Sequence, residues 1–337
     1  MMNILNALLE QAHRIKQTRG FSHDDSLPRL VIYPYDEAGR NVSNLIRYIW
    51  GIEADYLVDD TPKSDDVLSL EAFSRLYRPG KMLILFTAGR NGFIQPLMRH
   101  MFVSGINARD VIMTDKSNFL ASKAVEWLLN KPQYRTILDV GCGAGLQGRF
   151  FQDYGRQVTG ITMSDEAGYA GECLDHVVKC DFFAYQGAPC NAVWLSHVLE
   201  HIPLPVEFLK KAADLVTPEG CLAITVPHME QDILAGHIHT FSAGRLLRYM
   251  LCAGLDCREA EISASGYNLS IILPHVRRIP GNLGMNGAET MNDMYGDNQR
   301  IFSYLPKEIP IKKSWDGVYY FNGYITELNW EQGSIRI

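Results

Sequence analysis

Apolar and polar positions follow two periods along the chain and divide it into strand-length and helix-length segments. Three short apolar runs have the length of buried strands: residues 29–33, 54–58 and 82–86. Three segments carry the spacing of an amphipathic helix: residues 39–50, 67–76 and 96–103. Because strands and helices alternate in this order, the pattern predicts a small parallel sheet covered by helices before residue 115.

A second, longer series of the same kind follows residue 115. Its strand-like runs are residues 136–140, 157–161, 176–180, 192–195, 221–226 and 268–273. Its helical segments include residues 117–129, 205–216 and 242–253, the last ending at Gly254 as a C-cap. This series predicts a larger α/β domain with a doubly wound, mostly parallel sheet.

The two ends of the chain differ from these series. Residues 1–25 mix charge into an amphipathic pattern without a signal-peptide cleavage site, which predicts a short surface helix. An aromatic tail, W-D-G-V-Y-Y-F-N-G-Y-I-T-E-L-N-W, alternates like a hairpin. The predicted organisation is therefore an N-terminal helix (1–25), a small α/β domain (26–115), a larger α/β domain (116–275) and a C-terminal aromatic extension (276–337).

Composition narrows the classes of partner. The net charge is −6, so nothing in it indicates a nucleic-acid partner. No apolar run approaches the roughly 20 residues that span a bilayer. The seven cysteines contain no C-x-x-C pair and several lie in apolar runs, which favours reduced thiols in the cytoplasm over a disulfide or zinc framework.

A glycine-dense turn follows the first strand of the second series, where residues 137–148 read I-L-D-V-G-C-G-A-G-L-Q-G. Glycine lets a backbone approach a ligand closely and adopt positive φ, and the helix that follows offers unpaired N–H groups. Spacing alone leaves two interpretations open. Gly143-Ala-Gly145-Leu-Gln-Gly148 fits the dinucleotide fingerprint G-x-G-x-x-G, while L-D-V before Gly141-Cys-Gly143-Ala-Gly145 fits the other common version of such a loop.

The block L-D-V-G-C-G-A-G resembles the first motif of class I S-adenosylmethionine (SAM)-dependent methyltransferases, and four further pieces follow in order. K-C-D-F at residues 179–182 is similar to the family's acid after the third strand, and A-V-W-L-S-H-V-L-E-H-I at 192–202 resembles its fourth-strand motif. V-T-P-E-G before C-L-A-I-T-V, and then residues 236–254, resemble the segments that come next. The resemblance covers roughly residues 116–275 and implies a Rossmann-like class I methyltransferase domain with SAM as cofactor.

The resemblance also implies which residues hold the cofactor. They are Asp139, Gly141, Cys142, Gly143, Gly145, Thr162, Met163, Ser164, Asp181, Phe182, Ser196 and His197. Most members end the second strand with an acid that takes both ribose hydroxyls by charge-assisted hydrogen bonds. Thr162 stands there in this chain, within G-I-T-M-S, which is similar to the G-x-T-x-S of the cyclopropane synthase branch. We therefore expect SAM binding to survive the missing acid.

Histidines supply the candidate catalytic base. Methyl transfer from a sulfonium is an in-line displacement that needs alignment and exclusion of water, but a hydroxyl acceptor must also lose a proton. Histidine is the default base near neutral pH. Four histidines follow strands at the edge where the cofactor is expected: His197, His228, His237 and His239. Each also has a packing interpretation, His201 is expected to pack, and no metal site is predicted from this cluster.

The N-terminal series carries a second resemblance. V-I-Y-P-Y-D-E-A-G-R, A-D-Y-L-V-D-D-T-P and V-L-S-L-E-A-F resemble a small Rossmann-like domain of bacterial surface-polysaccharide biosynthesis enzymes. The first loop of those domains is glycine-rich, whereas Pro34 and Tyr35 stand there in this chain, and proline removes an N–H donor. A scaffold, a dimerisation surface or acceptor binding is favoured over nucleotide binding.

Together these features predict a cytoplasmic SAM-dependent methyltransferase that methylates a hydroxyl of a sugar or glycan precursor, a small-molecule acceptor. One alternative is an NAD(P)-dependent oxidoreductase with Asp165 or Glu166 as the ribose acid, but it does not explain H-V-L-E-H. Another is a non-catalytic SAM-binding or interaction protein. The acceptor, the methylated atom and homo-oligomer formation stay open at this point.

Overall fold

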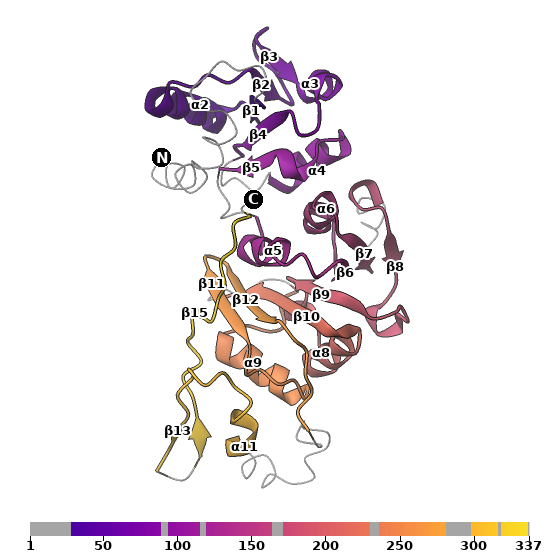
Figure 1. Ribbon diagram of the computed structural model, residues 1–337, viewed down its shortest axis with the longest axis vertical. Helices are drawn as coiled ribbons and strands as arrows, with labels where there is room; N and C mark the ends of the chain where they lie inside the picture. The colour runs from indigo at the N-terminus through magenta and orange to yellow at the C-terminus, as the bar shows by residue number, and fades with distance from the viewer. Residues whose placement is uncertain are drawn as a thin grey trace.

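Two separate sheets lie one beyond the other along the longest axis of the molecule (Figure 1). The computed structural model describes residues 28–88, 94–114, 119–163, 171–229, 236–280, 298–315, 318–335 and 337. The helix expected over residues 1–25 lies outside the described residues. The smaller sheet comes first in the chain and the larger sheet follows, as the two strand–helix series predict.

The smaller sheet has five parallel strands in the order β3-β2-β1-β4-β5. These strands are β1 (Arg29–Tyr33), β2 (Tyr56–Asp59), β3 (Val67–Ser69), β4 (Met82–Phe86) and β5 (Val111–Met113). Helix α2 (Glu37–Trp50) covers one face, while α3 (Leu70–Leu76) and α4 (Ile94–Val103) cover the other. Leu30 and Val31 belong to different apolar clusters on the two faces, which explains why β1 is apolar throughout.

Two details of this sheet differ from the sequence-based expectation. The helix expected over residues 67–76 is wrong in its first three residues, because Val67 and Leu68 pair with β2 as strand β3. Ser69 then begins α3 as its N-cap, accepting from the backbone N–H of Ala72 at 3.1 Å. Strand β5 was not expected, since a run of three apolar residues carries too little pattern to identify.

The larger sheet has eight strands in the order β15-β11-β12-β10-β9-β6-β7-β8. They are β6 (Thr136–Val140), β7 (Gln157–Thr162), β8 (Val177–Lys179), β9 (Cys190–Ser196), β10 (Val216–Pro227), β11 (Glu261–Ser265), β12 (Asn268–Leu273) and β15 (Glu327–Leu328). Strands β6 to β10 are parallel, and β12 runs antiparallel to both of its neighbours. The predicted doubly wound, mostly parallel Rossmann-like sheet is confirmed, with its switch point between β6 and β9.

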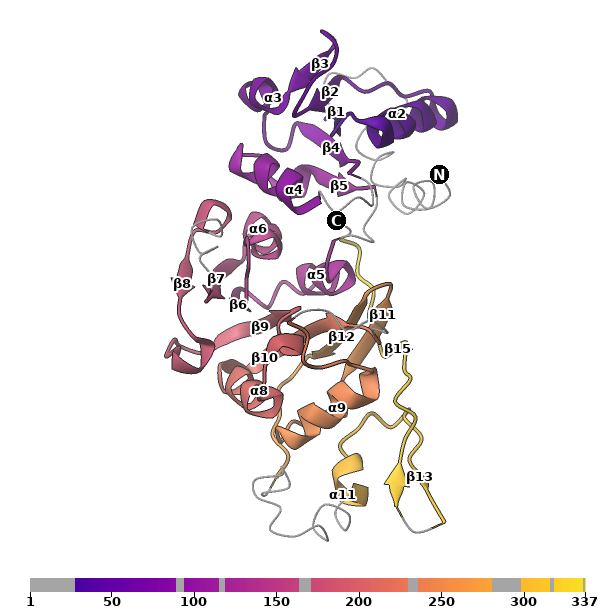
Figure 2. The same ribbon diagram turned by 180° about the vertical axis from the view of Figure 1, so that it is seen from behind.

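Helices cover both faces of this sheet (Figure 2). Helices α5 (Ser122–Leu129) and α6 (Leu146–Asp153) contribute to the apolar cluster on one face, and α8 (Pro205–Asp214) and α9 (Ala243–Cys252) to that on the other. No helix in the described ranges has both the length and the apolar character needed to cross a bilayer.

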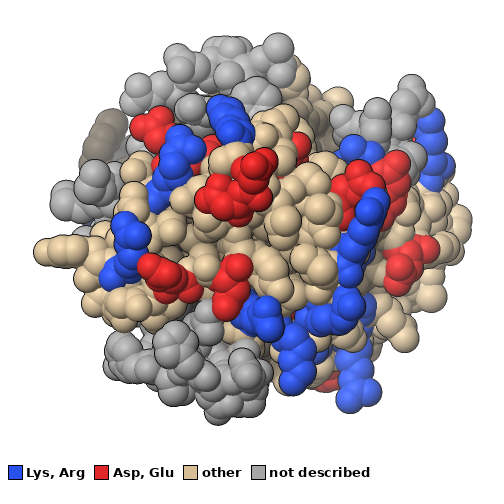
Figure 3. Space-filling model, turned by 90° about the horizontal axis from the view of Figure 1, so that it is seen from above, with Lys and Arg blue, Asp and Glu red and all other residues tan. Residues whose placement is uncertain are grey.

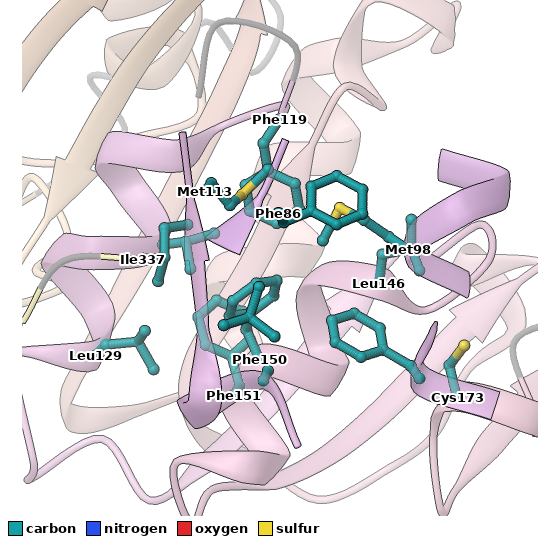
Figure 4. Close-up of a cluster of buried hydrophobic side chains, with 14 of the residues drawn as sticks. Phe86, Met98, Met113, Phe119, Leu129, Leu146, Phe150, Phe151, Cys173 and Ile337 are labelled. Atoms are coloured by element: carbon teal, nitrogen blue, oxygen red, sulfur yellow. The ribbon is translucent and has the colours of Figure 1, made fainter. Parts of the chain in front are cut away.

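One of the hydrophobic clusters contains residues of both domains and joins the two sheets. The ring of Phe102 on α4 meets that of Phe150 on α6 edge-on, with centroids 5.6 Å apart, and Phe119 packs against Phe150 at 5.1 Å. Figure 4 shows Phe86 and Met98 of the smaller domain near Phe150 of the larger one. The backbone N–H of Ala108 also donates to Asp153 Oδ2 at 2.6 Å. These contacts fix α4 against α6, so one face of α4 is turned towards the larger domain.

The C-terminal extension returns along the molecule instead of forming one long hairpin. After α11 (Asn298–Phe302), the short strands β13 (Lys312–Lys313) and β14 (Tyr319–Tyr320) pair antiparallel. The next residues leave this hairpin, and β15 joins the edge of the larger sheet beside β11. The hairpin expected over residues 315–330 is therefore wrong in extent, because its second half finds backbone partners on β11.

Acidic and basic side chains are mixed on the face of the molecule seen from above, at the end that carries the smaller sheet (Figure 3). Lys or Arg and Asp or Glu lie side by side among the described residues of this face. On this face, neighbouring charges of opposite sign offset each other.

Candidate functional site

The glycine loop between β6 and α6 has the backbone conformation that its sequence requires. Gly141, Gly143 and Gly145 have φ values of 75°, 51° and 76°, in the left-handed region that favours glycine. A Cβ on Gly141 would lie 2.3 Å from Val198 Cγ2, whereas one on Gly143 would meet nothing within 4 Å. The loop is thus closely packed at its start and open at its centre.

A cavity of about 470 Å³ opens beside this loop. Its lining residues come from both domains: Gln95, Pro96 and Arg99 on α4, and Phe119, Leu120, Gly141, Cys142, Gly143, Ala144, Leu146, Gln147, Ser196 and His197 from the larger domain. The contribution of α4 could not be foreseen, because the helical pattern of residues 96–103 does not say what its polar side chains face. Arg99 forms an ion pair with Glu172 of the larger domain.

Asp139, at the end of β6, is a buried carboxylate beneath the glycine loop. Its side chain is 2 % exposed, and Oδ2 has no hydrogen-bond partner among the described residues. Burial raises the pKa of Asp139 to about 7, because the charged form loses its hydration. Ionised Asp139 would therefore favour a cationic group bound nearby.

Thr162, Met163, Asp181 and Phe182, which were also implied for the cofactor, are not among the residues that line the cavity. Thr162 ends β7, where its carbonyl accepts from the N–H of Cys180 at 3.1 Å, and Met163 is exposed. Asp181 accepts from the N–H of Phe183 at 2.8 Å, and Phe182 packs on Phe208. Ser164 lies outside the described residues. The carboxyl ends of β7 and β8 thus meet, as the parallel sheet predicts.

His197 follows β9 and is held from three directions. Its Nε2 lies 2.8 Å from Asn268 Oδ1, which also accepts from the N–H of Ala121 at 3.0 Å. Asn268 Oδ1 is therefore an acceptor, so His197 Nε2 carries a hydrogen. Nδ1 lies 3.4 Å from Glu200 Oε1, and the ring stacks on Tyr267 with centroids 5.5 Å apart. The ring orientation of His197 is fixed by these contacts.

His228 follows β10 and has a different environment. Its backbone N–H donates to Tyr267 O at 2.9 Å, while its side-chain Nε2 is buried and has no hydrogen-bond partner among the described residues. Burial lowers the pKa of His228 below its ordinary value of 6.5. A neutral imidazole with an uncommitted nitrogen can accept a proton from a ligand.

Three further histidines lie near Glu200: His201, His237 and His239. The rings of His201 and His237 meet edge-on, with centroids 4.8 Å apart. His239 Nε2 donates to Ile202 O at 3.0 Å, so it is committed to the backbone. Glu200 was not identified from the sequence, although its place between two histidines in H-V-L-E-H is the signal that could have found it.

Known proteins resemble the larger domain. Residues 112–260 match the family described as "Methyltransferase domain". The matched residues include the glycine loop and all five motifs. The match agrees with the methyltransferase domain expected from the sequence. The match begins at residue 112, so the resemblance of the smaller domain to polysaccharide enzymes stays a prediction.

Among curated proteins, the chain is 31% identical over 105 residues to the ubiquinone biosynthesis O-methyltransferase of Xanthomonas axonopodis pv. citri, covering 28% of this chain and 44% of that protein. The enzyme of the same name from Shewanella halifaxensis is 28% identical over 142 residues, covering 39% of this chain and 58% of its own. The chain thus spans about half the length of these relatives.

Among solved structures, a Burkholderia thailandensis 1,6-didemethyltoxoflavin-N1-methyltransferase with S-adenosylhomocysteine is 19% identical with a TM-score of 0.40, covering 57% of this chain and 92% of its own. Magnesium protoporphyrin IX methyltransferase from Synechocystis PCC 6803 is 17% identical with a TM-score of 0.39, covering 56% and 97%.

Proposed function

We propose that this protein is a SAM-dependent methyltransferase that transfers the methyl group to a hydroxyl oxygen. The observation that carries the proposal is the loop of Gly141, Gly143 and Gly145, whose left-handed backbone borders a cavity of about 470 Å³ at the switch point of the sheet. The same loop lies within the matched methyltransferase domain. The cavity has the volume of an ordinary small-molecule site.

The two domains would hold the cofactor together. The loop and the amino end of α6 present backbone N–H groups to the amino-acid part of SAM, and Asp139 beneath them favours its positive charge. Gln95 and Arg99 reach the same cavity from α4 and are assigned to the carboxylate of that amino-acid part. Thr162 and Asp181 flank the site where β7 and β8 end, and they are assigned to the ribose and adenine.

The methyl group would pass in line from the sulfonium to the acceptor oxygen. The S–CH₃ bond breaks, the CH₃–O bond forms, and the sulfur leaves as a neutral thioether. The hydroxyl proton goes to His228 Nε2, which is buried and uncommitted among the described residues. His197 is assigned a positioning role, since its Nε2 already donates to Asn268 and Nδ1 faces Glu200.

A hydroxyl of a sugar or glycan precursor is the proposed acceptor. The assignment of oxygen is supported by the relatives named O-methyltransferases. The sugar rests on the resemblance of the smaller domain to polysaccharide enzymes. The ring of Tyr324 stacks on His228 and that of Tyr267 on His197. Both tyrosine rings are partly exposed and offer flat apolar surfaces for a ring-shaped acceptor.

Calorimetry with S-adenosylhomocysteine (SAH) tests the proposal. We expect saturable binding of one SAH per chain and no binding of NADH in an absorbance titration. NADH binding without SAH binding would favour the oxidoreductase alternative, and the absence of heat at millimolar SAH would contradict the proposal. A protein that binds SAH but transfers no methyl group to any fraction of a cell extract would be the non-catalytic alternative.

A further inference from the structure

A cluster of three side chains lies next to His197 and takes no proton or methyl group in the proposed methyl transfer. Glu200 and His201 belong to the 3₁₀ turn η4 (Leu199–His201), and His237 comes from a later loop. The N–H groups of Ile238 and His239 both donate to the carbonyl of Glu200, at 2.9 and 3.2 Å, which fastens that loop to the turn. One oxygen of Glu200 and one nitrogen of each of His201 and His237 consequently lie within 4.8 Å of one another.

The burial of Glu200 is the first sign that the cluster binds a cation. Its side chain is 1% exposed, and neither carboxylate oxygen has a hydrogen-bond partner among the described residues. A buried carboxylate without such partners is strongly unfavourable unless a positive charge lies close to it. Two imidazole nitrogens lie near Glu200 Oε1, His197 Nδ1 at 3.4 Å and His201 Nε2 at 3.9 Å.

The hydrogen bond of His201 is the second sign that the cluster binds a cation. His201 Nδ1 lies 2.8 Å from Gly236 O, so Nδ1 carries a hydrogen. In the neutral ring Nε2 then has a lone pair, and this atom lies 3.9 Å from Glu200 Oε1. A lone pair and a carboxylate oxygen repel each other unless a cation lies between them. An imidazole whose other nitrogen donates to a backbone carbonyl is the usual arrangement of a metal-bound histidine.

We propose that Glu200, His201 and His237 form a binding site for a divalent transition-metal ion. Two imidazole nitrogens and one carboxylate oxygen suit Zn²⁺ and ions of similar preference, such as Co²⁺. Three protein ligands leave at least one coordination position for water or a bound molecule. The His201 side chain is 45% exposed, so an ion can reach the cluster from solvent. The sequence alone predicts no metal here, because Glu200 and His237 meet only in the folded chain.

Cobalt spectroscopy of the full chain tests this site. Chelator-treated protein titrated with CoCl₂ is expected to develop visible d–d bands that saturate at one Co²⁺ per chain and disappear when Zn²⁺ is added. Glu200→Gln and His237→Ala are each expected to weaken Co²⁺ binding by about 100-fold or more, since losing a residue that only orients a ligand costs about 10–100-fold. His239→Gln, in the same loop, is the matched control and is expected to bind Co²⁺ normally.

The proposal is overturned if CoCl₂ produces no bands, or if Glu200→Gln and His237→Ala both bind Co²⁺ as the unaltered protein does. Glu200 would then hold a proton or face protonated histidines. SAH calorimetry on the same His237→Ala sample separates this result from the proposed function. Lost Co²⁺ binding with intact SAH binding supports the metal site, whereas loss of both in this variant together with normal Co²⁺ binding in Glu200→Gln contradicts it.

Discussion

The imidazole of His228 stacks against the ring of Tyr324, with centroids 6.3 Å apart and ring planes 30° apart. This contact joins the end of β10 to a residue of the C-terminal extension. The N–H of Gly244 donates to Gly323 O at 3.0 Å, which fixes the backbone next to Tyr324. The extension therefore lies against the proposed catalytic base, and we expect it to contribute to acceptor binding.

Replacing Tyr324 tests this role. Tyr324→Ala is expected to raise the KM for the acceptor by about 3–10-fold, because an aromatic pair contributes about 0.5–1.5 kcal/mol. The KM for SAM should stay the same, since Tyr324 does not line the cavity at the glycine loop. Steady-state kinetics with the acceptor that supports turnover measure both constants. Tyr320→Ala, on the β13–β14 hairpin, is the control, and an equal effect there would contradict the assignment.

His228 should set the acid limb of the pH profile. Because burial lowers its pKa below 6.5, the ring stays neutral and able to accept a proton down to lower pH than an exposed histidine. We expect kcat/KM to rise with pH through a pKa below 6.5 and then to level off at neutral pH.

His228→Gln is expected to lower kcat by about 10²–10⁴-fold, the usual contribution of a general base, while SAH still binds. His275→Gln, on an exposed histidine, serves as the control. Retained methyl transfer in His228→Gln would show that the acceptor is already nucleophilic or that another group takes the proton.

Asp139 predicts an unusual dependence of stability on pH. Its pKa is about 7 in the folded chain and 3.8 in a free side chain, so the folded state keeps a proton that the unfolded state loses. This contribution to stability is fully present below pH 3.8 and is lost as the pH rises through about 7. An asparagine does not titrate, so Asp139→Asn does not lose this stability. Its stability relative to the unaltered protein should therefore increase from pH 5 to pH 8, by about 2–3 kcal/mol. Urea unfolding of the ligand-free protein at both pH values measures the change; a difference that is independent of pH would contradict it.

Helix α4 should contribute to cofactor affinity although it belongs to the smaller domain. Gln95→Ala is expected to weaken SAH binding by about 3–10-fold, the effect of losing one hydrogen bond of about 1 kcal/mol. Gln157→Ala, at the exposed start of β7, is the control. Calorimetry that finds the same SAH affinity for Gln95→Ala and the unaltered protein would limit the cofactor site to the larger domain.

The local parts of the site were predictable from the sequence. A loop with three glycines after an apolar strand needs positive φ values, and Gly141, Gly143 and Gly145 all have them. The ends of β7 and β8 were also placed correctly, because parallel strands present their carboxyl ends at one edge. In each case the relevant interactions lie within a few residues or follow from the sheet order.

The parts that depend on tertiary contacts were not predictable. Arg99 reaches the cavity because α4 packs on α6, and no periodicity contains that information. Four histidines looked alike as bases, yet hydrogen bonds to Asn268 and Ile202 distinguish His197 and His239 from His228. Their partners lie far away in sequence or in the backbone of another turn, so only the folded chain separates them.

Two matched glycine substitutions test most directly whether the loop at the carboxyl edge holds the cofactor. Gly143 and Gly155 both have positive φ, and a Cβ on either would meet nothing within 4 Å, so leucine should strain both backbones similarly. Only Gly143 lines the cavity. In SAH calorimetry, Gly143→Leu is predicted to abolish binding while Gly155→Leu binds as the unaltered protein does. Undiminished SAH binding by a folded Gly143→Leu protein would contradict the account.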